Sequence, residues 1–353
     1  VTAFSTVAFA EEAQAEKDSY MVGYNLFGSA SYALLTLANN TDFPIVQMGD
    51  TPMQTNANFQ VETMIADVEN MCNAGCDGVC LWIPDDSLYD AFIGICSKYN
   101  VPFVLVDKVP QDPEIAERVK SNPLFVGAVC PANAVYGQKI ADYAVAKGWD
   151  TVLIGTPSKG DASDTPRLDA FLETFQANGG TVIDILYSEN GNDAQTRLEA
   201  SMMAEEPVFI YGTGSDYGIA AANALENTGM VGIPVVTSGL DAVALEYEAD
   251  GKIEMINGDF WVAGYFASVL MEAYLHGNKL VDADGNVPYI TDIQPFEVPA
   301  EQYELFKSVF LSESGQFYTA EETAALVNGT YDDFVAAIQN YNLEERAAAL
   351  GVQ

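Results

Sequence analysis

The chain has 353 residues, and 49% of them are hydrophobic, so it is long enough for two domains with sizeable cores. Asp and Glu total 51 against 14 Lys and Arg, which gives a net charge of −37. A surface of this kind repels phosphate groups, so we expect no nucleic-acid partner and no attachment to an anionic membrane surface.

The N-terminal segment is apolar and uncharged over residues 1–10, and it ends in Ala8-Phe9-Ala10 ahead of two glutamates. This small-x-small pattern is typical of a signal-peptidase site. We therefore interpret residues 1–18 as the remainder of a signal peptide with a disordered junction, and we expect a periplasmic or extracellular protein. The rest of the sequence contains no apolar stretch long enough to predict a membrane span.

From Tyr20 onward, strand patterns alternate with helix patterns. The clearest helix has apolar residues at helical spacing from Val61 to Cys72, and Gly75 follows it as a C-cap. The run DGVCLWIP at 77–84 is almost continuously apolar, which is typical of a parallel strand covered on both faces. In this half, the predicted strands are 19–25, 44–48, 77–84, 101–106 and 124–129, and the predicted helices are 29–38, 61–72 and 87–99.

The same alternation begins again near residue 150. An apolar strand introduced by Pro and followed by Asp occurs in both halves, at 100–107 and at 232–241. Thr165-Pro166 predicts a helix start with Thr165 as the N-cap. The other predicted elements of this half are strands at 150–155, 181–187, 207–211, 233–237 and 253–257 and helices at 195–203, 217–227, 242–250 and 261–275. The pattern predicts an α/β protein with two similar, doubly wound domains.

Neither the cysteines nor the acidic turn at 282–286 predicts a metal site. The five cysteines all precede residue 131, and their number and spacing fit buried hydrophobic residues better than a disulfide framework or a zinc site. Asp282-Ala283-Asp284-Gly285-Asn286 leaves a calcium loop and an Asp-Gly hairpin turn open, and its early Gly favours the turn. We expect no metal and no cofactor. Residues from about Pro299 onward are helical and acidic, with no recognisable chemistry.

Four motifs in a fixed order resemble those of the type I periplasmic binding proteins, the ribose- and galactose-binding group, over residues 20–296. They are Ala74-Gly75-Cys76-Asp77-Gly78-Val79 before an apolar strand and Pro84, the strand that ends in Asp107-Lys108, the helix start Arg167-x-x-x-Phe171, and Gly251-Lys252-Ile253.

The resemblance implies two Rossmann-like domains joined by three crossover strands, near 130–133, 257–259 and 289–294. The N-terminal lobe would contain 19–132 and 258–353, including a C-terminal extension, and the C-terminal lobe would contain 133–257.

Candidate ligand-binding residues lie just after the predicted strands, because open α/β sheets bind ligands beyond the carboxyl ends of their strands. A sugar requires polar groups for its hydroxyls and aromatic faces for its C–H patches. The candidates are Asn25, Phe27, Tyr32, Asp50, Asp107, Lys108, Arg167, Ser215, Asp216, Asp241, Asp259 and Trp261.

The resemblance implies that Asp107 and Arg167 face each other across a cleft. An Asp after a strand is also a common helix N-cap, which leaves a structural role open for Asp216 and Asp241. Trp82 is more typical of core than of a stacking residue. Arg167 opposes the charge preference of a first helical turn, and this mismatch favours a functional role.

These features predict a monomeric extracytoplasmic receptor that catalyses no reaction. It would capture a small polar ligand, expected to be a monosaccharide or related polyol, by hinge closure and deliver it to an ABC transporter permease. One alternative is a sensory protein that feeds a chemoreceptor or a two-component sensor. Another is a nucleotide-using enzyme, but the Gly-rich stretch 212–218 lacks both the dinucleotide fingerprint and the Walker lysine, and His276 is the only histidine.

Overall fold

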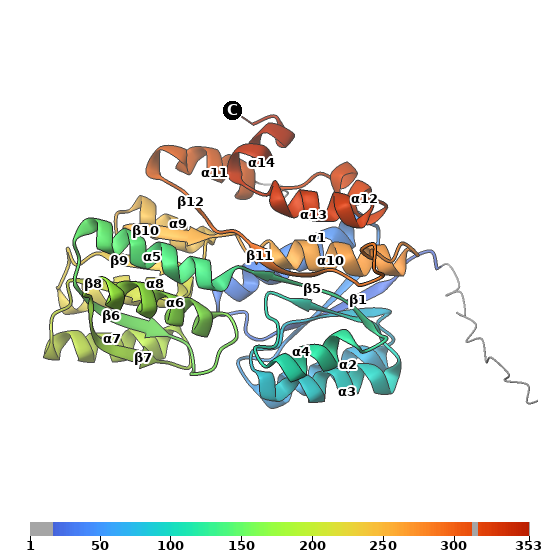
Figure 1. The fold of residues 1–353 in the computed structure, drawn as a ribbon, viewed down its shortest axis with the longest axis horizontal. Helices are drawn as coiled ribbons and strands as arrows, with labels where there is room; N and C mark the ends of the chain where they lie inside the picture. Colours follow the sequence, from blue (N-terminus) through green and yellow to red (C-terminus); the bar gives the residue numbers. More distant parts are fainter. Residues whose placement is uncertain (1–16, 313–316, 353) are drawn as a thin grey trace, which may run out of the picture.

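The computed structural model describes residues 17–312 and 317–352, so all but the last two residues of the predicted signal peptide fall outside the described residues. Two six-stranded sheets lie side by side, with helices on both faces of each (Figure 1). The C-terminal helices gather along one edge of the molecule, at the top of this view. The predicted α/β class with two Rossmann-like units is confirmed.

The first sheet is parallel throughout. From edge to edge its strands are β11 (Tyr289–Ile293), β5 (Phe125–Pro131), β4 (Phe103–Val106), β3 (Gly78–Leu81), β1 (Met21–Leu26) and β2 (Thr51–Asn56). Its helices are α1 (Tyr32–Gln47), α2 (Val61–Ala74), α3 (Tyr89–Tyr99), which the short 3-10 turn Asp86–Leu88 precedes, α4 (Pro113–Lys120) and α10 (Ala263–Leu275). Helices cover both faces, so β3, β4 and β5 are buried along their whole length.

The second sheet repeats this plan. From edge to edge its strands are β12 (Phe296–Glu297), β10 (Met255–Gly258), β9 (Val235–Ser238), β8 (Phe209–Gly212), β6 (Thr151–Thr156) and β7 (Thr181–Tyr187). Only β12 is antiparallel to its neighbour. The helices of this part are α5 (Asn133–Lys147), α6 (Asp164–Ala177), α7 (Gly191–Ala204), α8 (Ser215–Thr228) and α9 (Ala242–Ala249).

The two sheets have equivalent strand orders, β2-β1-β3-β4-β5-β11 and β7-β6-β8-β9-β10-β12. The sequence pattern of an apolar strand after Pro and before Asp occurs at β4 and at β9. These two strands occupy equivalent places in the two sheets. In each sheet the first strand lies between the two strands that follow it in the chain, β1 between β2 and β3, and β6 between β7 and β8. The order of the strands therefore changes direction between β1 and β3 and between β6 and β8. Crevices for ligands form at such switch points, outside the carboxyl ends of the strands.

The predicted strand at 44–48 is wrong, because these residues continue α1 and Pro44 lies inside the helix. Leu37, Thr41 and Ile45 recur every fourth residue, and all three are buried on the side of α1 that packs against α10. Burial of this stripe outweighs the cost of an internal proline. The helices α4 and α5 were not predicted.

The predicted N-cap at Thr165 is also wrong, since α6 begins two residues earlier, at Asp164 after Ser163. The Asp161 carboxylate accepts hydrogen bonds from the N–H groups of Ser163 and Asp164, at 2.9 and 3.0 Å. The Asp161 carboxylate, which lies before the helix, therefore accepts the hydrogen bonds that an N-cap side chain at Thr165 was expected to accept.

The segment 282–286 forms a tight turn rather than a hairpin, since the following β11 pairs in parallel with β5. The Asp282 carboxylate accepts hydrogen bonds from the backbone N–H groups of Asp284 and Asn286, each at 2.9 Å. Its own loop therefore supplies its partners.

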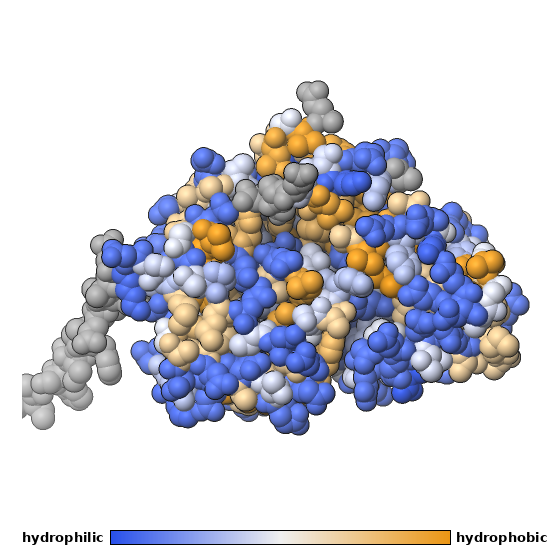
Figure 2. Space-filling view, turned by 180° about the vertical axis from the view of Figure 1, so that it is seen from behind, coloured by the Kyte–Doolittle hydropathy of each residue, from blue (hydrophilic) through white to orange (hydrophobic). Residues whose placement is uncertain are grey.

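The C-terminal segment forms the short turn Ala300–Gln302 and the helices α11 (Tyr303–Phe310), α12 (Ala320–Val327), α13 (Tyr331–Gln339) and α14 (Leu343–Leu350). Of these, α12 packs against α10 and α1. Hydrophilic residues cover most of the face in Figure 2, and hydrophobic ones gather beside this C-terminal group. Within the described ranges, every helix is too short or too polar to cross a membrane.

Candidate ligand-binding site

A cavity of about 1110 Å³ lies between the two sheets, and residues of both line it. Phe27, Trp82 and Asp107 come from the carboxyl ends of β1, β3 and β4 in the first sheet. Arg167 and Ser215 come from the first turns of α6 and α8, which follow β6 and β8. The cavity therefore joins the two switch points, where the topology favours ligand binding.

Eight of the twelve candidates from the sequence line this cavity: Phe27, Tyr32, Asp107, Lys108, Arg167, Ser215, Asp216 and Trp261. The four that do not are Asn25, Asp50, Asp241 and Asp259. They divide into three residues close behind the cavity wall and one that lies elsewhere.

Asn25, Asp241 and Asp259 have structural contacts. The Asn25 side chain exchanges two hydrogen bonds with the backbone of Trp82, at 2.8 and 2.9 Å, and so ties β1 to β3. Asp241 is the N-cap of α9, as its alternative interpretation foresaw. Asp259 accepts a hydrogen bond from the Trp261 N–H at 2.9 Å. One oxygen each of Asp241 and Asp259 is buried without a hydrogen-bond partner.

Asp50 lies away from the cavity, which corrects its place among the candidates. It precedes β2, whereas the cavity residues follow the opposite ends of the strands. Its carboxylate contacts His276 at 2.8 Å and accepts the Tyr20 N–H at 2.7 Å. The sequence placed it at the wrong end of a strand because residues 44–48 belong to α1.

Asp107 presents an unpaired acceptor at the cavity. Its Oδ2 accepts a hydrogen bond from the Trp82 indole N–H at 3.2 Å, while its Oδ1 is buried without a partner. Burial raises the pKa of this carboxyl group, and the charges of Lys108 and Arg167 oppose the rise. Its φ of 65° lies in the left-handed region, which costs a non-glycine residue about 1–2 kcal/mol. Strain of this kind is concentrated at functional sites.

Arg167 is fully buried at the start of α6, with 1% of its surface exposed. Its Nε donates to Asn133 at 2.8 Å, its Nη1 donates to the Thr213 carbonyl at 3.1 Å, and its guanidinium lies 4.8 Å from the centre of the Tyr136 ring. Nearby carboxylates, Asp164 foremost, overcome the effect of burial and raise its pKa. The guanidinium is therefore a fixed cation in the cavity wall.

Aromatic rings form another part of the wall. Phe27 and Trp82 stack with their centroids 5.6 Å apart, and the Lys108 ammonium lies 4.8 Å from the Trp82 ring centre. Trp261 lines the cavity from the crossover after β10, and its indole N–H is buried without a partner. Trp82 was interpreted as core, and the structure does bury it in the first hydrophobic core, at 5% exposure. It also lies at the cavity edge, because β3 ends at Leu81, three residues before the end of the predicted strand.

Several contacts bridge the two halves across the cavity. Lys108 forms an ion pair with Asp161 at 2.5 Å, and Ser31 donates a hydrogen bond to Asp216. The Ala162 N–H donates to the Pro84 carbonyl at 3.3 Å. Sequence reasoning missed Asp161 and Ser31, because neither directly follows a predicted strand. Both lie in loops whose function depends on the opposite half of the molecule.

The loop that carries Trp261 is strained and held from several sides. Phe260 and Trp261 have φ values of 55° and 57°, which is unusual for bulky residues. The Asn40 side chain donates to both of their carbonyls, at 2.7 and 3.2 Å, and the Tyr341 hydroxyl donates to the Asp259 carbonyl at 2.6 Å. The C-terminal extension thus supports a loop of the cavity from behind.

Comparison with known proteins assigns this architecture to a family. The sequence family described as "Periplasmic binding protein domain" matches residues 45–279. The chain belongs to this periplasmic binding protein family. No match was found among curated proteins.

Solved structures similar to this periplasmic binding protein include several solute-binding proteins of ABC transporters. One from Agrobacterium vitis, bound with α-D-tagatopyranose, has a TM-score of 0.68 at 15% identity, and the match covers 81% of this chain and 96% of that chain. The arabinose transporter component from Shewanella sp. ANA-3, bound to L-arabinofuranose, has a TM-score of 0.68 at 16% identity, with 88% and 98% covered. A third, from Actinobacillus succinogenes 130z with bound D-allose, has a TM-score of 0.67 at 20% identity, with 81% and 99% covered. At these identities the likeness concerns the fold.

We predict a pH dependence of stability from Asp259 in the ligand-free binding protein. Burial, and then the charge of Asp107, raise the pKa of Asp259 from 3.8 to about 6. The folded state therefore binds this proton more tightly than the unfolded state, and the contribution of Asp259 to stability is full below pH 3.8 and lost as the pH rises to 6. The loss is about 1.4 kcal/mol for each pH unit in this window.

The measurement is the free energy of unfolding in urea at pH 4 to 7, for the native chain and for Asp259→Asn. Asn keeps the acceptor for the Trp261 N–H and does not titrate. Between pH 4 and a pH above 6, the variant should therefore lose less free energy of unfolding than the native chain. The exposed Asp169→Asn variant should follow the native curve. Parallel curves for Asp259→Asn and the native chain would contradict the prediction.

Proposed function

We propose that this protein is an extracytoplasmic receptor that captures a monosaccharide or a related polyol in the cavity between its two lobes and delivers it to an ABC transporter permease. The N-terminal lobe would contain 19–132 and 258–353, the C-terminal lobe 133–257, and the hinge the connections near 130–133, 257–259 and 289–294. The protein would act as an exported monomer without catalytic activity.

The observation that carries the proposal is a set of unpaired polar atoms beside aromatic rings in one cavity between the two sheets. Asp107 Oδ1, Ser163 Oγ and Trp261 Nε1 belong to lining residues, and each is buried without a hydrogen-bond partner. Buried polar groups are rarely left unpaired, so a ligand rich in hydroxyls would supply what they lack. The stacked Phe27 and Trp82 would cover the C–H face of a sugar ring.

The charge of the lining favours a neutral ligand over a phosphorylated one. Two of its three cations are already engaged, Lys108 with Asp161 and Arg167 with Asn133 and Thr213. Carboxylates outnumber cations, since the acidic lining residues are Asp85, Asp107, Asp161, Asp164, Glu189 and Asp216, and the basic ones are Lys108, Lys159 and Arg167. A phosphate group would therefore meet net repulsion.

The test is a thermal-shift screen against monosaccharides, polyols, nucleosides and sugar phosphates, followed by calorimetry of each compound that raises the melting temperature. We expect at least one neutral sugar or polyol to bind with one site per chain, and its phosphorylated form to bind more weakly. A screen in which only nucleosides or only phosphorylated compounds bind would overturn the assignment.

We predict that the ligand identified in this screen makes the molecule more compact. The contacts described above that bridge the halves hold a closed arrangement. A bound ligand would add further contacts to both sides and shift the population towards it. Small-angle scattering should show a smaller radius of gyration with saturating ligand. An unchanged radius together with tight binding would contradict hinge closure while leaving ligand capture intact.

A pulldown with solubilised membrane components, with and without ligand, separates transport from sensing. Capture of a permease supports the proposal. Capture of a chemoreceptor or of a sensor kinase in its place would assign the protein to signalling.

A further inference from the structure

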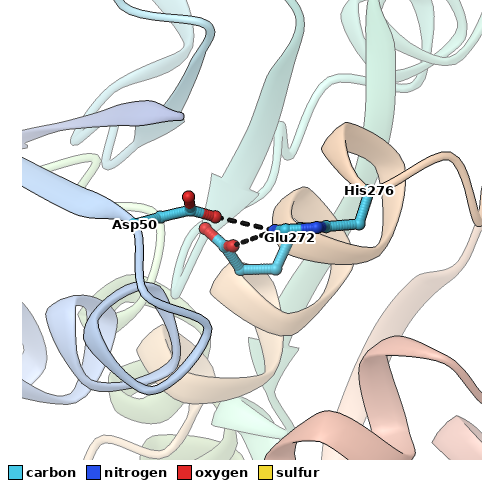
Figure 3. A group of neighbouring side chains, drawn as sticks. All are labelled: Asp50, Glu272 and His276. Atoms are coloured by element: carbon cyan, nitrogen blue, oxygen red, sulfur yellow. Dashed lines mark hydrogen bonds and ion pairs between the residues drawn. The ribbon is translucent and has the colours of Figure 1, made fainter. Parts of the chain in front are cut away.

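Three side chains suited to metal binding converge at the end of the first sheet opposite to the cavity. Asp50 lies between α1 and β2, and Glu272 and His276 lie one turn apart at the end of α10 (Figure 3). Asp50 and its partner Tyr20 precede the amino ends of β2 and β1, whereas cavity residues follow the carboxyl ends. This cluster is therefore separate from the proposed ligand site.

The distances in this cluster suit a small cation. His276 Nε2 lies 2.8 Å from Asp50 Oδ2 and 3.5 Å from Glu272 Oε2, and one ligand atom from each residue lies within 4.8 Å of the other two. Ligand atoms around a tetrahedral zinc ion, bound at about 2.0–2.2 Å, are about 3.3–3.6 Å apart. Small side-chain shifts would bring the three atoms to that spacing.

Glu272 supplies the independent observation that points to a missing partner. Its side chain is fully buried, and neither of its carboxylate oxygens has a hydrogen-bond partner, since its contact with His276 is a long ion pair of 3.5 Å. Figure 3 shows this carboxylate directed at Asp50 and His276 rather than away from them. A buried carboxylate without a hydrogen bond is expensive, and a second carboxylate beside it adds repulsion. A bound cation would remove both costs.

The surrounding contacts orient the ligands as they do in metal sites. The Tyr20 N–H donates to Asp50 Oδ1 at 2.7 Å, which leaves Oδ2 directed at His276. The Tyr20 ring packs edge-on against the imidazole, with centroids 5.1 Å apart. Such outer contacts fix ligand orientation. The His276 side chain is 29% exposed, so water and ions reach the cluster from its side.

We propose that Asp50, Glu272 and His276 bind one divalent cation of the zinc type, with water completing the coordination. Two carboxylates and one imidazole match the ligands that zinc accepts, whereas calcium requires six to eight oxygens, which this cluster does not offer. Bound there, the cation links the end of α1 to the end of α10 and stabilises the first lobe. The site neither requires nor excludes the proposed sugar function.

The chain offers a direct test, because His276 is its only histidine. In the intact protein, labelled with ¹⁵N and freed of metal with a chelator, NMR signals of the imidazole ring report on His276 without any assignment. Addition of ZnCl₂ should shift these signals and saturate at one equivalent, with one zinc per chain after dialysis. Ring signals that stay unchanged at two equivalents would overturn the proposal and leave the cluster as a proton-sharing structural group.

A variant and its control add a second readout that uses zinc alone. Glu272→Gln keeps the shape of the side chain and removes its charge, and should weaken zinc binding in calorimetry at least about tenfold. Asp282→Asn, in the acidic turn whose carboxylate is satisfied by its own loop, should bind zinc like the native chain. Equal zinc affinity of Glu272→Gln and the native chain would also overturn the proposal. If Glu272→Gln does not fold, the ring titration of the native chain still decides.

Discussion

Arg167→Ala is expected to weaken ligand binding between about tenfold and about a hundredfold. A hydrogen bond to a charged group contributes about 1.5–3 kcal/mol, and each 1.4 kcal/mol is tenfold in affinity. The substitution removes a fully buried cation from the cavity wall, and it leaves the Asn133 oxygen and the Thr213 carbonyl without their donor. Calorimetry with the sugar found in the screen measures the loss.

A matched control comes from the same half of the molecule. Arg197→Ala removes an exposed arginine whose contact is an ion pair with Asp193 one turn away, and it should bind ligand like the native chain. Asp107→Asn tests the facing acceptor without removing Arg167 and should also weaken binding. Native affinity in both Arg167→Ala and Asp107→Asn, with folding verified by circular dichroism, would refute their place in the ligand site.

The second large effect is expected at Phe260, whose ring joins the strained cavity loop to the C-terminal extension. The ring is 5% exposed and packs against Phe306, Phe310 and Phe317, with centroids 5.5, 5.0 and 5.9 Å away. Phe260→Ala should lower the free energy of unfolding by about 3–5 kcal/mol. Because Asp259 and Trp261 flank this residue, ligand affinity should fall as well.

Comparison of two variants at this position separates packing from backbone strain. Both Phe260→Ala and Phe260→Gly lose the ring, but glycine accepts the φ of 55° without strain, so we expect Phe260→Gly to be more stable than Phe260→Ala by about 1 kcal/mol. Urea unfolding measures both, and Val231→Ala, at a 72% exposed side chain, should change stability by less than about 0.5 kcal/mol. Native stability of Phe260→Ala would show that the extension does not hold the loop.

Local sequence signals predicted the helices and strands wherever periodicity and end signals agreed. Gly75, Gly229 and Asp241 mark helix ends in the structure as they do in the sequence. The signals failed in α1, where a proline was interpreted as a strand start although its helix is stabilised by packing on α10. The same failure misplaced Asp50, because its distance from the cavity depends on where α1 ends.

By itself, the sequence determined the class of fold, the repeated strand–helix alternation and eight of the residues that line the cavity, including Asp107 and Arg167, since these follow from patterns within single elements. Only the tertiary structure decided which side chains meet across the cavity, such as Lys108 with Asp161, and that Asp50 meets Glu272 and His276. It also placed the C-terminal aromatic residues behind the loop of Asp259 and Trp261. The physical reason is that these contacts join segments distant in the chain, whose separation in space depends on the packing of whole helices and sheets.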